Sequence, residues 1–474
     1  MISKSFSLSA PFKIMFIKPR VNTPVSVLDI PLGILSLSAY IKKYSSFPVQ
    51  THCLDLRLTQ NSKILTQKID TIQPHLIGIS LMDCESNFLN DYQTVLEKYH
   101  KTISLVAGGP YATGHYETII RTTCISLVIV GEGERSFLGL VQRLVCGQSL
   151  NDLQGLAWRS KEGTAIFNGK APYIENLDDI PIPDYDLIPL DKYQGYHPNM
   201  NGVLAEHRYI PVMSSRACPF RCIFCHNMFG KKVRPRSVDH FIKEIKLLRY
   251  QYNIREFHII DDYFNFDRKR MHAILDQIIQ DNVTIRIAFP NALRGDQLCY
   301  EDILRLKQAG TYMINFAVET GSKRLQKKTG KHLNLDVILQ NIAIAKKMGI
   351  ITRGYFMLGF PSETRSELQE TIDLACNSDL SMVSFFTVIP FKGTPLYEWS
   401  CSAYPQMKAS QEADFWSSGE LYSSATGLSL KRIKKLATIR FYSFQRLVRL
   451  MKNAPRKIYF FARFAHSAIS ILRS

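Results

Sequence analysis

The sequence predicts an α/β protein with two domains, a doubly wound parallel sheet followed by a (βα)6 partial barrel. Strand-like and helix-like segments alternate in two separate series along the 474 residues, and a proline-rich stretch divides them. The composition is globular, with 46% hydrophobic and 21% charged residues, which excludes disordered and fibrous classes. Ten cysteines are too few for a disulfide framework in a chain of this length, and three of them lie within eight residues.

The first series occupies residues 1–150. Short apolar runs predict its strands, and apolar residues at helical spacing predict helices between them. The expected strands are Lys13–Ile17, Val49–Leu54, Leu76–Leu81, Ile103–Ala107 and Leu127–Val130, and the clearest helices are Leu32–Lys42 and Ile64–Ile72. Strands that alternate with helices predict a parallel sheet covered on both faces, as in Rossmann-like domains.

Small residues follow three of these expected strands. Ser80 ends the third, Gly108-Gly109-Pro110 follows the fourth, and Gly131-Glu132 follows the fifth. Ligands of doubly wound sheets lie beyond the carboxyl ends of the strands, where glycine lets the backbone approach a large planar ligand. Glycine also simply ends strands, so the spacing alone leaves both interpretations open.

Residues 151–203 are expected to be a linker, because the segment 180–185 carries two prolines that disfavour helix and central strand. The second series occupies residues 204–420. Its expected strands are Tyr209–Ser214, Glu256–Ile260, Ile285–Phe289, Met313–Val318, Thr352–Leu358 and Val383–Ile389. Helical patterns lie between these strands, so the series predicts a (βα)6 partial TIM barrel with its functional groups at the strand ends.

The basic charge is concentrated in the C-terminal segment, residues 421–474. This segment holds twelve Lys or Arg and no Asp or Glu, which is two thirds of the net charge of +18. Leu, Ile, Phe and Tyr alternate with the basic residues, which predicts a basic amphipathic helical tail. Two interpretations stay open, a helix on an anionic membrane surface and a helical hairpin packed on the barrel with its basic face in water.

The apolar stretch 458–472 is shorter than the ~20 residues of a membrane span and contains Arg463 and His466. With no targeting segment visible, the expected location is the cytoplasm, with peripheral contact at the inner face of the membrane. Nucleic acid is not expected as a partner, because no recognised nucleic-acid module surrounds the tail.

Three cysteines follow the first strand of the second series, Cys218, Cys222 and Cys225 in C-P-F-R-C-I-F-C. Thiolates at this C-x3-C-x2-C spacing can surround one soft-metal centre. Structural zinc sites and electron-transfer clusters normally take four protein ligands, so three ligands favour a [4Fe–4S] cluster with one iron open. The alternative is a zinc site that includes His226, although adjacent Cys225 and His226 are poorly placed to bind one ion.

Preceded by Ser214-Ser215-Arg216-Ala217, this motif resembles the signature of the radical SAM superfamily. The N-terminal half is similar to a cobalamin-binding Rossmann-like domain. Together they resemble the cobalamin-dependent radical SAM enzymes, such as the class B methylases, over about residues 12 to 400. The resemblance implies that Cys218, Cys222 and Cys225 hold a [4Fe–4S] cluster whose open iron binds S-adenosylmethionine (SAM). It also implies cleavage of SAM to a 5′-deoxyadenosyl radical.

The resemblance implies SAM contacts at the ends of the barrel strands. Phe224 would lie by the adenine, and Asp261 and Asp262 stand where the superfamily has a GGE-type motif, here without its glycines. An acidic acceptor for the SAM amino group is thereby kept. Arg294 and Glu319 match further positions of the SAM pocket. Ordinary salt bridges at the barrel mouth are the alternative for these four charged residues.

The resemblance also implies that Ser80, Gly108, Gly109, Pro110, Gly131 and Glu132 contact cobalamin. His75 is not expected to bind cobalt, because Q-P-H-L-I-G lacks the aspartate of the mutase motif and precedes the wrong strand. Cys53, Cys84 and Cys124 are expected to be buried apolar residues and not ligands of a second cluster.

The expected function is methylation of an unactivated carbon of a small-molecule or lipid substrate. A reductase, flavodoxin or ferredoxin is the expected electron donor. Cyclisation, rearrangement or oxygen insertion with the same cofactors is the enzyme alternative. A cobalamin-based sensor or regulator is the alternative from another class, and it gives no role to the three cysteines.

Overall fold

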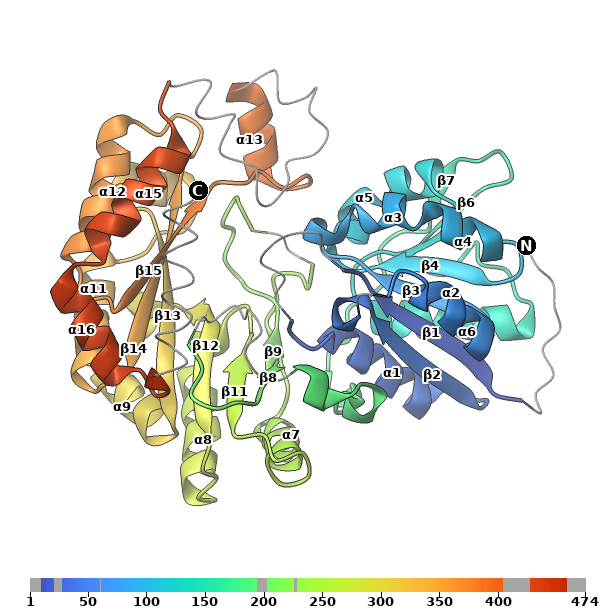
Figure 1. The fold of residues 1–474 in the computed structure, drawn as a ribbon, viewed down its shortest axis with the longest axis horizontal. Helices are drawn as coiled ribbons and strands as arrows, with labels where there is room; N and C mark the ends of the chain where they lie inside the picture. The colour runs from blue at the N-terminus through green and yellow to red at the C-terminus, as the bar shows by residue number, and fades with distance from the viewer. Residues whose placement is uncertain are drawn as a thin grey trace. The chain divides into compact units, whose positions relative to one another are not determined.

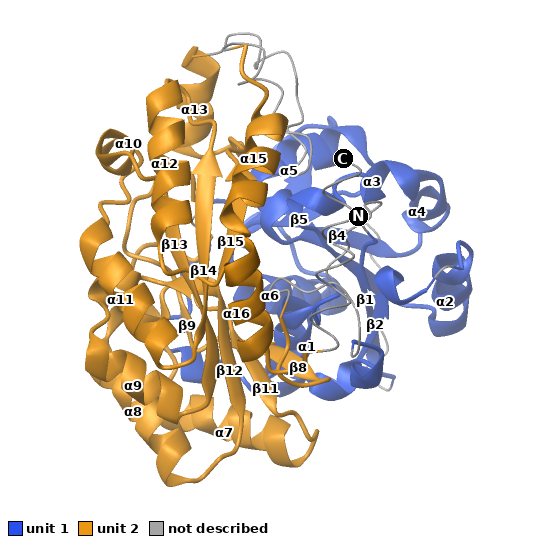
Figure 2. Cartoon of the chain, turned by 60° about the vertical axis from the view of Figure 1, so that its left-hand side comes forward, with its two compact units in different colours: residues 1–193 blue, residues 194–474 orange. Residues whose placement is uncertain are grey.

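The computed structural model describes residues 10–20, 28–59, 61–193, 203–225, 228–403 and 427–457. The chain forms two compact units, residues 1–193 and 194–474 (Figure 2). The division lies inside the expected linker 151–203, most of which belongs to the first unit. His226, the apolar stretch 458–472 and residues 421–426 of the expected tail lie outside the described residues.

The first unit is built on a seven-stranded sheet with the order β2-β1-β3-β4-β5-β6-β7 (Figure 1). The strands are β1 (Phe12–Lys18), β2 (Val49–Asp55), β3 (Leu76–Ser80), β4 (Ser104–Gly108), β5 (Leu127–Ile129), β6 (Leu156–Arg159) and β7 (Ala165–Phe167). The first five strands pair in parallel, as the sequence predicts. Their order is that of a doubly wound fold with its topological switch between β1 and β3.

Helices cover both faces of this sheet. They are α1 (Leu32–Tyr44), α2 (Ile64–Ile72), α3 (Phe88–Asp91), α4 (Gln93–Tyr99), α5 (Pro110–Thr122) and α6 (Gly133–Cys146). Ile14 and Phe16 of β1 pack in one core with α1 and α6, and Met15 and Ile17 pack in the other with α2, α4 and α5. Because successive strand side chains point to opposite faces, each buried strand contributes to both cores.

The segment after β5 differs from the expected linker. β6 and β7 pair antiparallel and extend the sheet at its edge. The proline-rich part is irregular but packs on the same unit, where Tyr185 is buried and Asp184 accepts hydrogen bonds from Ser38 and Lys42, both at 2.6 Å. Short antiparallel edge strands carry no long apolar run, which is why the sequence pattern misses them.

The second unit is built on a six-stranded sheet with the order β15-β14-β13-β12-β11-β8, in which all neighbours are parallel. The strands are β8 (Tyr209–Val212), β11 (Glu256–Ile259), β12 (Arg286–Leu293), β13 (Thr311–Glu319), β14 (Ile351–Leu358) and β15 (Met382–Thr387). The helices are α7 (Val238–Tyr250), α8 (Arg268–Gln280), α9 (Tyr300–Gln308), α10 (Lys323–Lys328), α11 (Leu335–Lys347), α12 (Arg365–Asn377) and α13 (Pro395–Ala403). Parallel strands in sequential order, with helices between them, form the predicted (βα)6 partial barrel.

Two C-terminal helices complete the second unit, α15 (Leu430–Phe441) and α16 (Phe444–Asn453). Helix α15 packs on β15 and α12. Leu450 and Ala454 join a core cluster with Tyr312 and Met313 of β13. The basic tail is therefore helical and docked on the barrel over its described part. Within the described ranges, no helix has both the length and the apolar character that a membrane crossing requires.

Candidate functional site

The three cysteines lie in the loop that follows β8, at the carboxyl end of the barrel strands. Cys222 is buried, Cys218 is half-buried and Cys225 is exposed. Two short strands flank the loop, β9 (Ser215–Arg216) before the cysteines and β10 (Arg234–Pro235) after them, and they pair antiparallel. Among the described residues, no three His, Cys, Asp or Glu side chains are gathered closely enough to hold a single metal ion.

The backbone of this cysteine loop is held from several sides. Ala217, just before the first cysteine, has a φ of 79°, a left-handed conformation that residues with a side chain rarely adopt. Its N–H donates to Asp262 Oδ2 at 3.2 Å. Further along, Ile223 N donates to Thr329 O at 3.0 Å and Ile223 O accepts from Leu396 N at 3.0 Å. A strained backbone that is also held by hydrogen bonds at Ala217 and Ile223 is typical of preorganised sites.

The thiols of the loop interact with one another and with nearby cations. A hydrogen bond from the Cys225 thiol lowers the pKa of Cys222 to about 6, and the charges of Lys331 and Arg294 act in the same direction. The same bond raises the pKa of Cys225. Three thiols on one fixed loop, with cations beside them, fit an anionic iron–sulfur cluster.

The two neighbouring aspartates after β11 have different environments. Asp261 is buried and accepts hydrogen bonds from Ser214 N, Ser214 Oγ and Ser215 Oγ, each at 2.6 Å. Burial raises the pKa of Asp261. Asp262 is exposed, and its Oδ2 accepts the hydrogen bond from Ala217 N. Asp261 therefore fixes the segment that precedes the cysteines, and Asp262 is accessible. The SAM contact expected at these two residues stays a prediction.

Arg294 follows a register irregularity of β12, where Ala292 has a φ of 74°. Its guanidinium lies 3.8 Å from the ring centroid of Phe220, in the cysteine loop. It also donates to Lys331 O at 3.1 Å and His332 O at 3.2 Å. Arg294 thus joins the cysteine loop to the loop after α10, a role that sequence reasoning did not assign to it.

Glu319 ends β13 with a φ of 69°, also in the left-handed region. Its Oε1 lies 3.1 Å from Lys331 Nζ, and both side chains are largely buried. Phe224, between the second and third cysteines, is half-buried against a cluster of Leu325, Phe360, Val388 and Leu396. These two predicted SAM residues, like Asp262, therefore lie at the same end of the barrel as the cysteines.

The glycines at the strand ends of the first unit fall into two kinds. A Cβ on Gly109, whose φ is 96°, would lie 2.6 Å from Leu81 O, so this glycine is required by packing of the chain itself. A Cβ on Gly131, whose φ is 90°, would meet no atom within 4 Å. Ser80, Gly108 and Pro110 are half-buried, and Glu132 Oε2 accepts from Ile174 N at 3.2 Å. Gly131 is thus the strand end with open space beside its backbone.

The first unit also contains the histidine and the three cysteines that were not expected to bind a metal. His75 lies just before β3, at the amino end of the sheet, where its Nδ1 accepts from Lys13 N at 2.9 Å and its ring stacks on Phe12. Cys53, Cys84 and Cys124 were expected to be buried, and the structure shows them half-buried. Burial raises the pKa of each, to about 12 for Cys53, which keeps these thiols protonated.

The radical SAM superfamily profile matches residues 212–375. An uncharacterized methyltransferase of Pyrococcus horikoshii is 31% identical over 396 residues, which are 82% of this chain and 83% of the relative. The chain belongs to the radical SAM superfamily. It is therefore an enzyme, and the cysteine loop after the first barrel strand is the superfamily's signature loop.

Two solved structures share the radical SAM barrel and the domain before it. The methyltransferase TsrM from Kitasatospora setae superposes with a TM-score of 0.69 at 16% identity, covering 82% of this chain and 76% of TsrM. The cobalamin-dependent SAM radical enzyme OxsB gives a TM-score of 0.66 at 18% identity, covering 87% of this chain and 58% of OxsB. These likenesses confirm the predicted fold class, a Rossmann-like domain followed by a radical SAM partial barrel.

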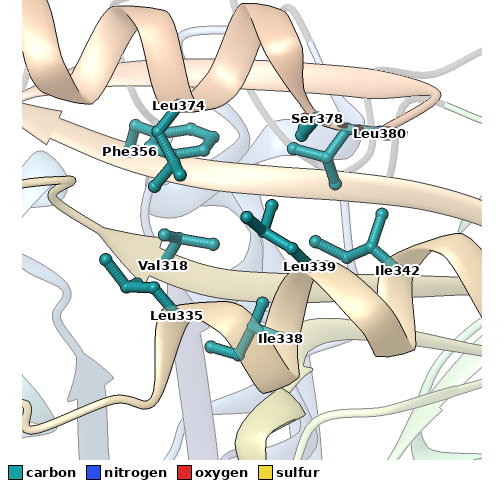
Figure 3. A pocket seen from close by; sticks show the side chains of 9 residues that line it. All are labelled: Val318, Leu335, Ile338, Leu339, Ile342, Phe356, Leu374, Ser378 and Leu380. Atoms are coloured by element: carbon teal, nitrogen blue, oxygen red, sulfur yellow. Dashed lines mark hydrogen bonds between the residues drawn. The ribbon is translucent and has the colours of Figure 1, made fainter.

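An apolar gap elsewhere in the barrel unit is not part of this radical SAM site. It lies between helices α11 and α12 and the strands beneath them (Figure 3). Its lining residues are Val318, Leu335, Ile338, Leu339, Ile342, Phe356, Leu374, Ser378 and Leu380. The gap is too narrow to admit a water molecule, and its lining is almost wholly aliphatic or aromatic. It is an imperfection in core packing.

Sequence reasoning missed Lys331 and Phe220 in the radical SAM site. Phe220 lies between the first two cysteines, and its ring is tilted against that of Tyr263 with the centroids 5.3 Å apart. Lys331 lies in the loop between α10 and α11, after a run of lysines on an exposed helix. The Gly330-Lys331 pair resembles an ordinary helix end in the sequence, so no local signal separates it from its neighbours.

Proposed function

We propose that this chain is a cobalamin-dependent radical SAM methyltransferase that uses a [4Fe–4S] cluster, SAM and cobalamin. The observation that carries the proposal is the fixed loop of three cysteines at the carboxyl end of a parallel barrel. Three cysteine ligands leave one iron of a cubane cluster open to a small molecule. The similarity to a methyltransferase supports methyl transfer. The likeness to OxsB, a cobalamin-dependent enzyme, supports the use of cobalamin.

Cys218, Cys222 and Cys225 would hold the cluster, which when bound supplies the electron that cleaves SAM. The protein's own residues then have distinct tasks. The accessible carboxylate of Asp262 is placed to accept hydrogen bonds from the SAM ammonium group. Phe224 offers an apolar surface to the adenine, and Glu319 contributes a fixed negative charge at the end of β13.

Ser80, Gly108, Gly131 and the residues beside them would hold cobalamin at the carboxyl ends of β3, β4 and β5. Cobalamin, when bound, supplies a carrier for the methyl group. The open space beside the backbone of Gly131 suits a large planar ring, because a flat ligand needs close approach without side chains in the way. His75 lies at the amino end of β3, away from these carboxyl ends, and is proposed to take no part.

The proposed reaction is methylation of an unactivated carbon of a small molecule or a lipid. The electron comes from a low-potential donor such as a reductase, flavodoxin or ferredoxin. Cyclisation, rearrangement or oxygen insertion with the same cofactors is the second candidate, because no contact among the described residues identifies the acceptor carbon.

The first test needs no substrate. The protein is purified anaerobically, reconstituted with iron, sulfide and cobalamin, reduced, and mixed with SAM. We expect S-adenosylhomocysteine and methylcobalamin to form together, and to disappear when cobalamin is omitted. Formation of 5′-deoxyadenosine alone would retain the radical chemistry, contradict methyl transfer and favour the second candidate.

We also propose peripheral contact of helices α15 and α16 with the inner face of the membrane. Residues 427–457 contain ten Lys or Arg and no acidic residue. Leu436, Ile439 and Phe444 are 56%, 52% and 81% exposed among these charges. Exposed apolar side chains between basic ones suit an anionic bilayer surface.

Co-sedimentation with vesicles tests this contact. We expect binding to vesicles that contain phosphatidylglycerol and weak binding to phosphatidylcholine alone. Replacing Leu436, Ile439 and Phe444 together by Ser should lower the bound fraction severalfold. Tyr300→Ser is the matched control, because Tyr300 is 60% exposed on α9, outside this surface. Equal binding of the triple variant and the wild type would contradict the proposal.

A further inference from the structure

Residues 329 and 330, in the loop between α10 and α11, contact the cysteine loop directly, and residues 331 and 332 are joined to it through Arg294. Thr329 O accepts from Ile223 N at 3.0 Å, and Gly330 O lies 3.7 Å from Cys222 Sγ. The carbonyls of Lys331 and His332 accept from Arg294, which also stacks on Phe220. These contacts hold the loop in a fixed position beside the cysteines.

Gly330 allows this close approach. Its φ is 70°, and a Cβ at this position would lie 2.9 Å from Arg221 O in the cysteine loop. Only glycine combines that backbone conformation with that short distance. The residue after it, Lys331, is consequently brought beside the cysteines by the main chain, independently of its side-chain conformation.

The ammonium group of Lys331 is directed inward. Its side chain is 15% exposed, and its Nζ lies 3.1 Å from Oε1 of Glu319, whose side chain is 9% exposed. The strained backbone of Glu319, with a φ of 69°, helps to hold that carboxylate in place. The main chain beside Lys331 holds this ion pair close to the cysteine loop, because Gly330 O lies 3.7 Å from Cys222 Sγ.

A buried lysine paired with one glutamate is close to neutral in its contribution to stability, because desolvation cancels most of the attraction. The arrangement gains when further negative charge is present beside the lysine. The three cysteine thiolates of a bound cluster would supply that negative charge. The Lys331 ammonium would then favour the reduced state of the cluster, which carries one more electron.

We propose that Lys331 is an electrostatic positioning residue for the cysteine-bound cluster, and that its ammonium favours one-electron reduction of the cluster. The inference rests on the proposed radical SAM function. No bond forms or breaks at Lys331. The electron is supplied by the low-potential donor, passes to the cluster and is countered by a charge that the fold already holds there.

The test compares reconstituted wild-type protein with Lys331→Met and Lys331→Arg. Lys327→Met is the matched control, because Lys327 is an exposed lysine on the preceding helix. Iron content is measured first. The midpoint potential of the cluster is then determined by redox titration without SAM, with the reduced fraction followed by electron paramagnetic resonance. Activity is not needed for this readout.

Lys331→Met should shift the midpoint to more negative potential, so that at a fixed potential the ratio of reduced to oxidised cluster falls on the order of tenfold. Lys331→Arg and Lys327→Met should stay at the wild-type midpoint. Glu319→Gln leaves the lysine without its counter-charge and should shift the midpoint in the positive direction. This variant keeps the inference testable if Lys331→Met does not fold.

An unchanged midpoint in Lys331→Met with full iron content would overturn the inference, even if SAM then bound more weakly. A negative or absent shift in Glu319→Gln would also overturn it. A wild-type protein that takes up no cluster would instead overturn the proposed function, and this inference with it. The iron measurement on the wild type separates these two failures.

Discussion

The strand ends of the two units present different chemistry. In the first unit, glycines leave the backbone accessible at the strand ends, and a Cβ at Gly131 would have no atom within 4 Å. In the barrel unit they offer charged side chains that already have partners, Arg294 on the ring of Phe220 and Glu319 in an ion pair with Lys331. A large planar ligand needs surface and close approach, whereas a small charged one needs fixed counter-charges. Under the proposed function, the same topological position would therefore serve two kinds of cofactor.

The largest effect that this comparison predicts is loss of the cluster from the barrel unit alone. Cys222→Ala removes one of three ligands, so we expect reconstituted iron to fall to background while cobalamin retention is unchanged. Iron and cobalt are quantified after gel filtration. Cys376→Ala, which removes a half-buried cysteine of α12, should retain full iron. Iron retained by the Cys222 variant would contradict the assigned ligands.

The reciprocal prediction concerns Gly131. Gly131→Leu places a side chain in the open space, so we expect cobalamin affinity to fall at least about tenfold with iron content unchanged. Equilibrium dialysis or absorbance titration measures the affinity. Gly147→Leu is the control, because Gly147 also has a positive φ, 64°, with no atom within 4 Å of a Cβ. Both variants carry a similar backbone strain of about 1–2 kcal/mol. If both lost cobalamin equally, strain and not ligand contact would be the cause.

Asp261 and Asp262 sharpen the comparison within the barrel unit. Asp261→Asn replaces an acceptor of three hydrogen bonds by a group that is partly a donor, so we expect the free energy of unfolding to fall by about 1–3 kcal/mol. Asp262→Asn should leave stability unchanged and weaken SAM binding. Chemical denaturation and calorimetric SAM titration distinguish the two. A reversed pattern would return the SAM contact to Asp261.

A pH-dependent effect on stability is expected from Glu363, in the turn after β14. Its Oε2 accepts from Gly359 N at 2.5 Å and Phe360 N at 3.0 Å, yet burial raises the pKa of its carboxyl from 4.5 to about 7. The folded state thus binds this proton more tightly than the unfolded chain does. Its contribution to stability is complete below pH 4.5 and is lost as the pH rises to about 7.

Glu363→Gln should remove that pH dependence. Relative to the variant, the wild type should lose stability between pH 4.5 and about 7 by at most about 1.4 kcal/mol per pH unit. Thermal denaturation of both proteins across this range measures the difference. Parallel pH profiles would show that the turn carboxyl is not the titrating group.

The sequence pattern was sufficient for the parallel strands of both units, because buried strands in α/β proteins are continuous apolar runs. It missed β6 and β7, which are short and lie at a sheet edge. It located the cysteine loop from spacing alone. It could not separate Asp261 from Asp262, since the serines that bind Asp261 are 46 and 47 residues away. Lys331 was missed for the same reason, as Gly330 beside it is 108 residues from Cys222.

The central claim is that three cysteines hold a [4Fe–4S] cluster with one iron open to SAM. Electron paramagnetic resonance of the reduced, fully reconstituted protein before and after addition of SAM tests it most directly. We predict that the spectrum of the reduced cluster changes on SAM addition in the wild type and that Asp262→Asn needs more SAM for the same change. A fully loaded cluster whose spectrum is the same with and without SAM would contradict the account.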